Sequence, residues 1–335
     1  MKVVAKKSVL AGHIIVPGSK SHTIRSLILA GMADGISHIY NPLESNDCLS
    51  TVEALRQIGA EVTFGDEKQS VWTVKGAGKN LHLPEKEINV GNSGSLMYFL
   101  APVLSTLEGE CTFTGDESIC KRPVDHLLDA FNQLGVETKS LETTGMPPFS
   151  FKGPINIENK LVTEGALSQY ISGFMMAATR MNGTLNMQLE NPKETPYLTM
   201  TKNWLETVGA KADISKNFKK ISVTGPVELQ PFEKSIPSDW EGVAFPLIAA
   251  IISGTGSSIV IDNVDSTGTQ GDEKIVDILK SVGANIVWDK NNNCLRVSGS
   301  RRLTTKGLPR KTLKVNISEY PDAICALSVI ACFIE

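Results

Sequence analysis

The sequence has no segment that would direct it into or across a membrane. Residues 1–20 contain no long apolar stretch and no small-residue cleavage site, so they do not resemble a signal peptide. The longest apolar runs, Phe245–Ile252 and Ala323–Ile334, are too short for a membrane span and contain proline or polar residues typical of buried helices. We therefore expect a cytoplasmic chain with no membrane partner.

Basic residues are not in excess either. The 335 residues include 33 Lys and Arg against 36 Asp and Glu, which gives a net charge of −3 and a pI of about 6.0. This balance argues against a nucleic-acid partner, although a local cluster of cations can still bind a small anionic substrate. With 41% hydrophobic residues, a chain of this length is expected to form two domains.

The sequence also lacks the motifs of metal and nucleotide chemistry. None of its six cysteines forms a CxxC pair or lies near a histidine at metal-ligand spacing, so we expect reduced, mostly buried thiols and no metal site. There is no P-loop and no GxGxxG motif, which argues against ATP hydrolysis of the P-loop kind. The five histidines are scattered, and no Ser-His-Asp set is recognisable.

What the sequence does contain is an internal repeat of about 75 residues. Four times a helical pattern ends at a glycine and passes directly into a strand, as in ALRQIGAEV and AFNQLGVET. The pattern predicts a glycine in the left-handed conformation at each of these helix ends. The four glycines are Gly59, Gly135, Gly209 and Gly283.

A second recurring pattern is an apolar helix that ends at a glycine. Its glycines are Gly35, Gly109, Gly183 and Gly254, and a fifth copy of the helix occupies residues 321–335. Short β-branched strands lie between the helices, so each repeat is expected to be a βαβαββ unit. The first helix of each unit should be buried and the second, charged on one face, should lie outside. Four units are complete, and the fifth stops after its first helix.

Polar or glycine-containing turns precede the buried helices. The free N–H groups and the dipole of a helix start bind anions. In PGSKSHTIR, Lys20 and Arg25 lie near the first helix start, with Ser19 or Ser21 as its cap. Two cations beside two hydroxyls suit a phosphate or a carboxylate. The alternative is a capped, solvated helix start without a ligand.

Two further starts carry candidate ligand contacts. The loop GNSG brings Asn92 and Gly94 to the second buried helix, and its small residues let the backbone approach a ligand. Arg122 stands before Pro123, which is expected to open an outer helix. Alternatively, Arg122 is an ordinary surface arginine.

The later buried helices begin with hydroxyl, amide and carboxyl side chains. Ser168 and Gln169 begin the third, and Asp239 and Asp322 precede the next two. An aspartate at such a position is usually a cap. It becomes a general base only if burial or neighbouring groups shift its pKa.

Taken in order, the motifs PGSKS…R, GNSG, GD…KRP, SQ, PY, QGD and PDA resemble those of the EPSP synthase family of enolpyruvyl transferases. The resemblance implies an inside-out α/β (α+β) fold of two domains, each of three βαβαββ units with helices inside and sheets outside. About four and a half of those six units are present. Residues 17–237 are expected to form the first enolpyruvyl-transferase domain. Residues 1–16 and 238–335 are expected to form the second, incomplete at its C-terminus.

The resemblance also implies a reaction. This family transfers the enolpyruvyl group of phosphoenolpyruvate to the 5-hydroxyl of shikimate 3-phosphate, giving EPSP and phosphate. The step belongs to the shikimate pathway, which leads through chorismate to the aromatic amino acids. It requires neither a metal nor an organic cofactor. We expect a monomer that acts on these two small substrates.

Site residues follow from the resemblance position by position. Lys20 should contact both substrates, and Asp322 should bind the ring hydroxyls and act as the base, so these two are the expected catalytic residues. The remaining contacts are assigned by subsite: Ser21 and Arg25 on the carboxylate side of shikimate; Asn92, Gly94 and Arg122 at phosphoenolpyruvate; Ser168 and Gln169 at shikimate 3-phosphate; and Tyr197 in the PY motif.

Several positions depart from the family pattern. Tyr98 stands where an arginine is expected, Leu167 replaces the first serine of an SSQ triplet, and Ile24 replaces a polar residue. Glu194 replaces a serine before PY, and its charge would repel a phosphate unless it points away. The late R-x-K-E-x-D-R segment and the later His-Arg and Lys are absent. These departures predict weak or no turnover by the 335-residue chain.

Two other functions remain open at this point. One is a diverged transferase with another acceptor, such as the UDP-N-acetylglucosamine type. The other is a non-catalytic relative that binds an anion or a partner.

Overall fold

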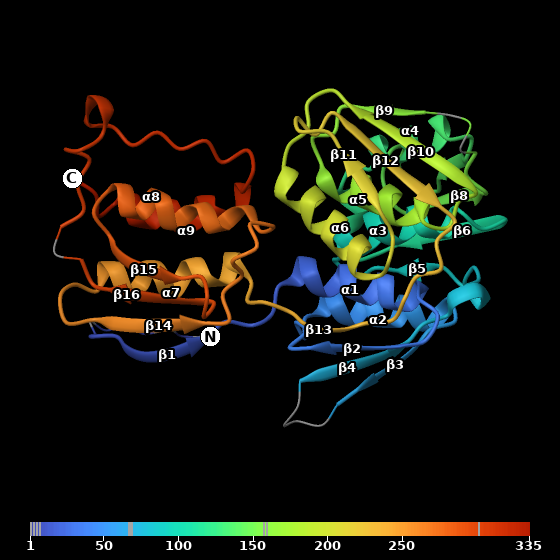
Figure 1. The fold of residues 1–335 in the computed structure, drawn as a ribbon. Helices are drawn as coiled ribbons and strands as arrows, with labels where there is room; N and C mark the ends of the chain where they lie inside the picture. The colour runs from blue at the N-terminus through green and yellow to red at the C-terminus, as the bar shows by residue number, and fades with distance from the viewer. Residues whose placement is uncertain are drawn as a thin grey trace. The chain divides into compact units, whose positions relative to one another are not determined.

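The computed structural model describes residues 2, 4, 6, 8–65, 70–156, 158, 160–300 and 302–335. They form two compact units, distinguishable by colour in Figure 1. The central unit comprises Lys20–Ile236, and the terminal unit joins the residues before position 20 to Pro237–Glu335.

Six helices, arranged in two sets, form the interior and the flanks of the central unit (Figure 1). The inner set is buried along nearly its whole length because its sequences are apolar or small on every side; it consists of α1 (Lys20–Met32), α3 (Gly94–Leu104) and α5 (Ser168–Ala178). The flanking set keeps one face exposed; it consists of α2 (Asn46–Gln57), α4 (Asp125–Gln133) and α6 (Thr195–Thr207). In the central unit, the prediction of a buried first helix and an outer second helix is confirmed. It is wrong for the fifth copy of the first helix, residues 324–331, where Ile324 and Val329 are exposed.

Three four-stranded sheets enclose these helices. The first has the order β13 (Glu233–Ser235), β2 (Ile36–Tyr40), β4 (Val71–Lys75), β3 (Glu61–Phe64). The second has the order β5 (Ile88–Asn89), β6 (Gly109–Thr114), β8 (Phe149–Gly153), β7 (Glu137–Ser140). The third has the order β9 (Leu161–Thr163), β10 (Gly183–Leu189), β12 (Lys220–Gly225), β11 (Ala212–Ile214). Side chains alternate between buried and outward positions along the strands, so each sheet packs on the helices with one face. The inside-out α/β fold predicted from the sequence is confirmed.

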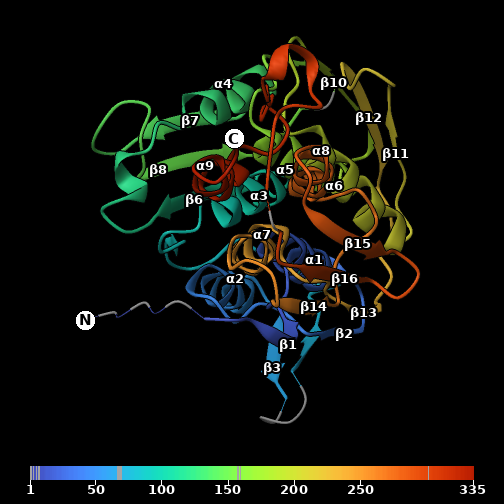
Figure 2. The same ribbon diagram turned by 90° about the vertical axis from the view of Figure 1, so that its left-hand side faces the viewer.

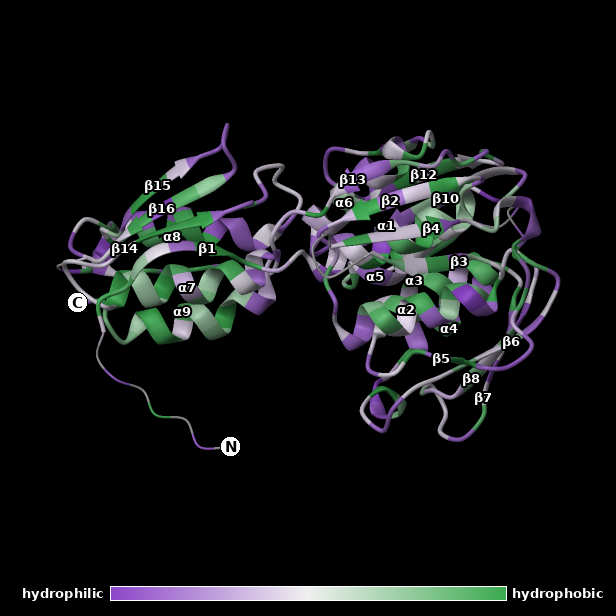
Figure 3. Cartoon of the chain, turned by 90° about the horizontal axis from the view of Figure 1, so that it is seen from below, coloured by the Kyte–Doolittle hydropathy of each residue, from purple (hydrophilic) through white to green (hydrophobic). Residues whose placement is uncertain are grey.

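The terminal unit contains a fourth sheet of the same plan. Its order is β1 (Ala11–Ile15), β14 (Ser258–Asp262), β16 (Cys294–Ser298), β15 (Asn285–Asp289). Helix α7 (Trp240–Ile252) packs on this sheet and against α9 (Ile324–Ala331), and Figure 3 shows apolar residues along both helices. Helix α8 (Ile275–Ser281) follows a 3-10 turn and contacts β15. The same arrangement is seen from another side in Figure 2.

Short 3-10 turns connect several elements: η1 (Gly78–Asn80), η2 (Ile119–Lys121), η3 (Gly271–Lys274), η4 (Pro309–Lys311) and η5 (Pro321–Ala323). Among the helices in the described ranges, none has both the length and the hydropathy needed to cross a bilayer.

Two edge strands, β1 and β13, pair in a different unit from the buried helix that follows them in the sequence. In the second and third sheets, the parallel edge strand is the one that precedes the buried helix of the same repeat. By contrast, β1 precedes α1 but pairs with β14, and β13 precedes α7 but pairs with β2. The chain therefore passes twice between the units, and an isolated bridge pairs Gly18 with Ser238 next to these passages.

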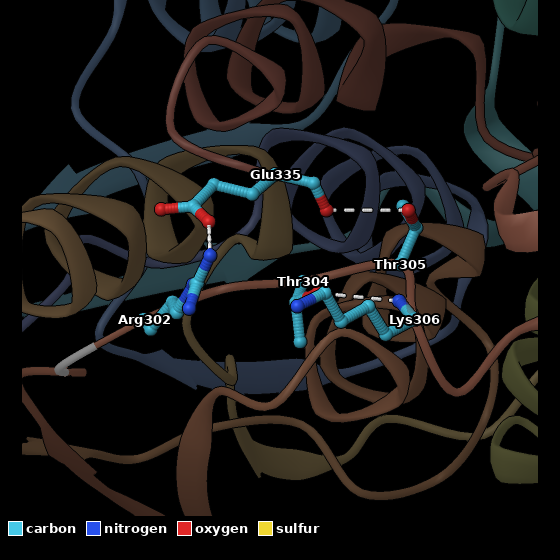
Figure 4. Close-up of polar contacts among 5 residues, drawn as sticks. All are labelled: Arg302, Thr304, Thr305, Lys306 and Glu335. Atoms are coloured by element: carbon cyan, nitrogen blue, oxygen red, sulfur yellow. Dashed lines mark hydrogen bonds and ion pairs between the residues drawn. The ribbon is translucent and has the colours of Figure 1, made fainter.

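The last residues pair with a nearby loop of the terminal unit (Figure 4). The N–H of Glu335 donates to the carbonyl oxygen of Leu303 at 3.0 Å, and its own carbonyl oxygen accepts from the N–H of Thr305 at 2.8 Å. The side chains of Arg302 and Glu335 form an ion pair. A short parallel bridge thus follows α9.

The helix ends predicted from glycine are confirmed, and the helix start predicted from Pro123 is wrong. The four repeat glycines have φ values of 102°, 75°, 86° and 97°, as predicted for left-handed helix ends. Asp239 accepts from the N–H of Glu241 and caps α7, as expected. The prediction that Pro123 opens a helix is wrong, because α4 begins at Asp125. Val124 is the N-cap residue, with non-helical φ −123° and ψ 15°, and its carbonyl oxygen accepts from the N–H of Leu128 at 3.1 Å.

Close packing of α3 against α5 yields the first prediction. A Cβ at Gly173 would lie 2.1 Å from the carbonyl oxygen of Tyr98, so Gly173→Ala must push the two helices apart. We expect a loss of about 1–3 kcal/mol, seen as a lower urea midpoint by circular dichroism. Gly307→Ala is the matched control, since a Cβ there has no neighbour within 4 Å. An unchanged midpoint for Gly173→Ala would contradict this account of the packing.

Candidate functional site

The N-terminal ends of the three buried helices lie at one end of the central unit. Gln169 at the start of α5 donates through Nε2 to Ser95 Oγ at the start of α3, at 3.0 Å. At the opposite ends, Arg180 after α5 donates to Thr106 Oγ1 after α3, at 3.3 Å. The two helices are therefore parallel. Arg25, in the second turn of α1, reaches Ser172 in the second turn of α5. At the opposite ends, Arg180 after α5 donates to the carbonyl oxygen of Gly78, which lies beside Asp34 after α1, so α1 runs in the same direction.

This arrangement concentrates partial positive charge. A helix start offers free N–H groups and the positive end of its dipole. Three parallel starts side by side therefore favour anions over neutral ligands. Lys20 and Ser21 form the first turn of α1, and both are half-buried.

Arg25 is buried within this end of the unit, with 1% of its surface exposed. Its Nε donates to Thr201 Oγ1 at 2.8 Å, and its Nη1 donates to the carbonyl oxygen of Ser21 at 3.0 Å. Its guanidinium lies 4.5 Å from the ring centre of Phe99. The guanidinium of Arg25, which the resemblance assigns to the carboxylate of shikimate, is thus already in contact with Thr201, Ser21 and Phe99.

Burial and charged neighbours act in opposite directions on Arg25. Burial lowers the pKa of the guanidinium to about 9, whereas Tyr197 and Glu194 raise it. Its charge at neutral pH is retained at a cost in desolvation. The buried cation therefore adds positive potential near the starts of α1 and α5.

The α3 start brings together three of the predicted residues. Asn92 Oδ1 accepts from Arg122 Nη2 at 2.8 Å, and Asn92 Nδ2 donates to Asp116 Oδ2 at 2.7 Å. The hydrogen bond from Asn92 is the largest of the effects that lower the pKa of Asp116. A Cβ at Gly94 would lie 3.7 Å from Arg122 Nη1, an ordinary contact distance, so the guanidinium lies next to the first residue of α3. The exposed arginine is held in place by Asn92 and by Ser118.

Tyr98 fills the position where the family pattern has an arginine. Its ring lies 5.2 Å from that of His126, which in turn lies 4.9 Å from that of Tyr170. Burial raises the pKa of Tyr98 to about 12 and lowers that of His126. Among the described residues, His126 Nε2 is a buried nitrogen without a hydrogen-bond partner. Where the resemblance to the family predicts a cation, this chain therefore has a tyrosine that packs with the rings of His126 and Tyr170.

The α5 start brings together the remaining predicted residues of the central unit. Ser168 is buried, and its N–H and hydroxyl both donate to Glu194 Oε2, at 3.2 Å and 3.0 Å. Gln169 is half-buried beside it. Tyr197, in the first turn of α6, has its ring centre 5.9 Å from the Arg25 guanidinium.

Asp322 belongs to the terminal unit. It is exposed on the turn η5 before α9, and the N-cap positions of η5 and α9 are occupied by Tyr320 and Ala323 instead. Within the described parts of the chain, no group of three or more His, Cys, Asp or Glu side chains is placed to hold a metal ion.

The polar partners of Arg25 were not identified from the sequence. Ser172 and Thr201 hydrogen-bond to each other at 2.8 Å as well as to Arg25. The sequence pattern that could have identified them is a hydroxyl side chain, Ser172 or Thr201, among apolar residues of a helix. Asp116 was visible only as part of the GD…KRP motif.

The fold and the site define an inside-out α/β protein whose parallel helix starts are equipped to hold small anions. A family model described as EPSP synthase (3-phosphoshikimate 1-carboxyvinyltransferase) matches residues 4–335. The chain belongs to this family.

Individual relatives agree with the family match. The 3-phosphoshikimate 1-carboxyvinyltransferase of Acetivibrio thermocellus is 34% identical over 333 residues, which cover 99% of this chain and 75% of that protein. The protein of the same name from Methanocaldococcus jannaschii is 33% identical, with the same coverage. The solved structure of EPSP synthase from Acinetobacter baumannii superposes with a TM-score of 0.79 at 25% identity, covering 97% of this chain and 71% of that one.

The buried environment of Arg25 yields the second prediction. Arg25→Met leaves the hydroxyls of Thr201 and Ser172 without their cationic partner in a buried site, and we expect a loss of about 1–3 kcal/mol of stability. Urea denaturation followed by circular dichroism measures it. Arg56→Met, on the partly exposed face of α2, is the control and should cost less. An equal decrease in the free energy of unfolding for the two variants would show that the buried contacts of Arg25 contribute no more to stability than an exposed ion pair.

Proposed function

We propose that this chain transfers the enolpyruvyl group of phosphoenolpyruvate to the 5-hydroxyl of shikimate 3-phosphate, releasing phosphate and EPSP, with the weak turnover expected from its departures from the family pattern. The observation that carries the proposal is the convergence of the α1, α3 and α5 starts in a chain of the EPSP synthase family. Both substrates carry a phosphate and a carboxylate, and such groups require several cations and N–H donors close together.

The two anionic substrates are assigned to different helix starts. Asn92, Gly94 and Arg122 are proposed to bind phosphoenolpyruvate, supported by the fixed orientation of the guanidinium and its position next to Gly94 at the α3 start. Ser168 and Gln169 are proposed to bind shikimate 3-phosphate at the α5 start. The Gln169–Ser95 hydrogen bond supports the proximity of these two subsites.

Residues near α1 and α6 complete the proposed acceptor site. Ser21 and Tyr197 line the carboxylate side of shikimate, where Arg25 contributes its buried charge. Lys20 lies at the α1 start and contacts both substrates. This division is supported by the parallel direction of α1 and α5.

The chemistry needs a base and a centre of positive charge. Asp322 is proposed to accept the proton of the 5-hydroxyl as its oxygen attacks C2 of phosphoenolpyruvate, while the methylene carbon takes up a proton to give a tetrahedral intermediate. Loss of phosphate from C2 and of a proton from the new methyl group then restores the double bond and gives EPSP. Lys20 stabilises the negative charge that develops on the substrates. No metal or organic cofactor takes part in this scheme.

We further propose that the protein is a monomeric cytoplasmic enzyme of the route to chorismate and the aromatic amino acids. Its near-balanced charge supports a role that involves neither nucleic acid nor a membrane. The relatives described above share one enzyme name, so neither a different acceptor nor a non-catalytic role is favoured.

The third prediction tests the acceptor. Titration of shikimate 3-phosphate into the 335-residue chain should give saturable heat in calorimetry. Gln169→Ala should weaken binding about two- to tenfold, the effect of one hydrogen bond. Gln188→Ala is the control, because this glutamine lies on β10 and pairs with Lys160. Absence of binding by a folded sample would mean that the acceptor is misassigned.

The fourth prediction tests the phosphoenolpyruvate subsite. Arg122→Lys keeps the charge but removes the planar fork that Asn92 orients, so phosphoenolpyruvate should bind about tenfold more weakly in the presence of shikimate 3-phosphate. Lys121→Ala is the control, since it removes a neighbouring cation that pairs with Glu117 on the surface. If Lys121→Ala has the larger effect, the subsite lies elsewhere.

A further inference from the structure

The start of α5 is capped by a carboxylate from another helix. Leu167, the residue at the N-cap position, has no side chain that can cap. Instead, Glu194 Oε2 accepts from the backbone N–H of Ser168 at 3.2 Å and from its hydroxyl at 3.0 Å. Two of the donors that this helix start can present to an anion, the N–H and the hydroxyl of Ser168, are therefore already used by the chain itself.

Glu194 is held in this position by the backbone of the α6 start. Helices α5 and α6 lie side by side in the central unit (Figure 1). Glu194 occupies the N-cap position of α6 with φ 51° and ψ 35°, a left-handed conformation that is unfavourable for a residue with a Cβ. Its side chain makes no cap for α6 and is directed to α5 instead.

The charge of Glu194 is part of the electrostatics of the site. It is among the groups that raise the pKa of Arg25, so the carboxylate and the buried guanidinium interact. Lys193, the adjacent residue, is exposed. A phosphate that reached the Ser168 donors would meet a carboxylate already bound there, and two anions at one set of donors repel each other.

We propose that Glu194 is a specificity-determining residue that competes with the phosphate of the acceptor for the start of α5. This inference rests on the proposed function, because it takes the α5 start as the subsite of shikimate 3-phosphate. The phosphorylated acceptor binds only when the carboxylate leaves Ser168. Unphosphorylated shikimate has no phosphate group to compete with Glu194 for Ser168.

The test is a comparison of three ligands with two charge-removing variants. Glu194→Gln keeps the size of the side chain and an oxygen that can accept from Ser168, and it removes the charge. Glu190→Gln is the matched control, since it removes the same charge from an exposed position in the same loop. Calorimetric titrations use inorganic phosphate, shikimate 3-phosphate and unphosphorylated shikimate. Urea midpoints establish that the variants are folded.

The competition predicts a pattern specific to phosphate. Glu194→Gln should bind inorganic phosphate and shikimate 3-phosphate at least about tenfold more tightly than the native chain, with shikimate affinity unchanged. Glu190→Gln should match the native chain for all three ligands. Glu194→Ser, which also removes the cap, should show the same gain and serves if the glutamine variant does not fold.

The outcomes separate this inference from the function on which it rests. No gain for phosphate in either Glu194 variant overturns the inference and identifies Glu194 as a structural cap. An equal gain in Glu190→Gln also overturns it, because the effect is then one of general charge. A gain for inorganic phosphate without binding of either shikimate ligand supports the competition but rejects the proposed acceptor.

Discussion

The parallel packing of α1, α3 and α5 is the constraint on which the central unit depends. Because these helices are buried on nearly every side, their flanks must be apolar or small, as at Gly173. The polar groups that a buried helix cannot satisfy internally are confined to its ends. At the C-terminal ends, Arg180 supplies donors to Thr106 and to the carbonyl oxygen of Gly78. At the N-terminal ends, the unused N–H groups require acceptors, and an anion is the natural ligand.

The local features of the fold were predictable from the sequence, because each depends on a few neighbouring residues. A glycine between a helical and a strand pattern is sufficient to predict a left-handed cap, and the positive φ at Gly59 or Gly283 needs no tertiary information. The alternation of buried and outer helices follows from hydropathy alone. At Pro123 the local signal gave the wrong start, because Val124 has non-helical φ −123° and ψ 15° as the N-cap residue and α4 begins only at Asp125.

The candidate site was predictable only in part. Its residue types were visible at the helix starts, but their surroundings depend on contacts between distant segments. Arg25 is in contact with Ser172 and Thr201, which lie 147 and 176 positions away, so its burial could not be seen in the motif that contains it. Likewise, the rings of Tyr98, His126 and Tyr170 come from three different helices.

The sheet in which an edge strand pairs was likewise not predictable from the sequence. β1 and β13 each precede a buried helix, as β5 and β9 do, and no local pattern distinguishes a strand that pairs within its own repeat from one that crosses over. Backbone hydrogen bonds fix the crossover: Ser19 donates to the carbonyl oxygen of Pro237 at 2.8 Å, and Asp239 donates to that of Pro17 at 3.0 Å. The first sheet of the central unit is therefore completed by a strand that lies almost 200 positions from β2.

The caps of the buried helices differ in a way that bears on ligand binding. Ser93 accepts from the N–H of Leu96 and caps α3 with its own N-cap side chain, and Asp239 does the same for α7. A cap of this kind is fixed by the backbone that carries it. At α5 the cap comes from Glu194, the N-cap residue of α6, so it is not fixed by the backbone that precedes α5. The proposed competition between the Glu194 carboxylate and a phosphate therefore concerns a cap that lies outside the segment it stabilises.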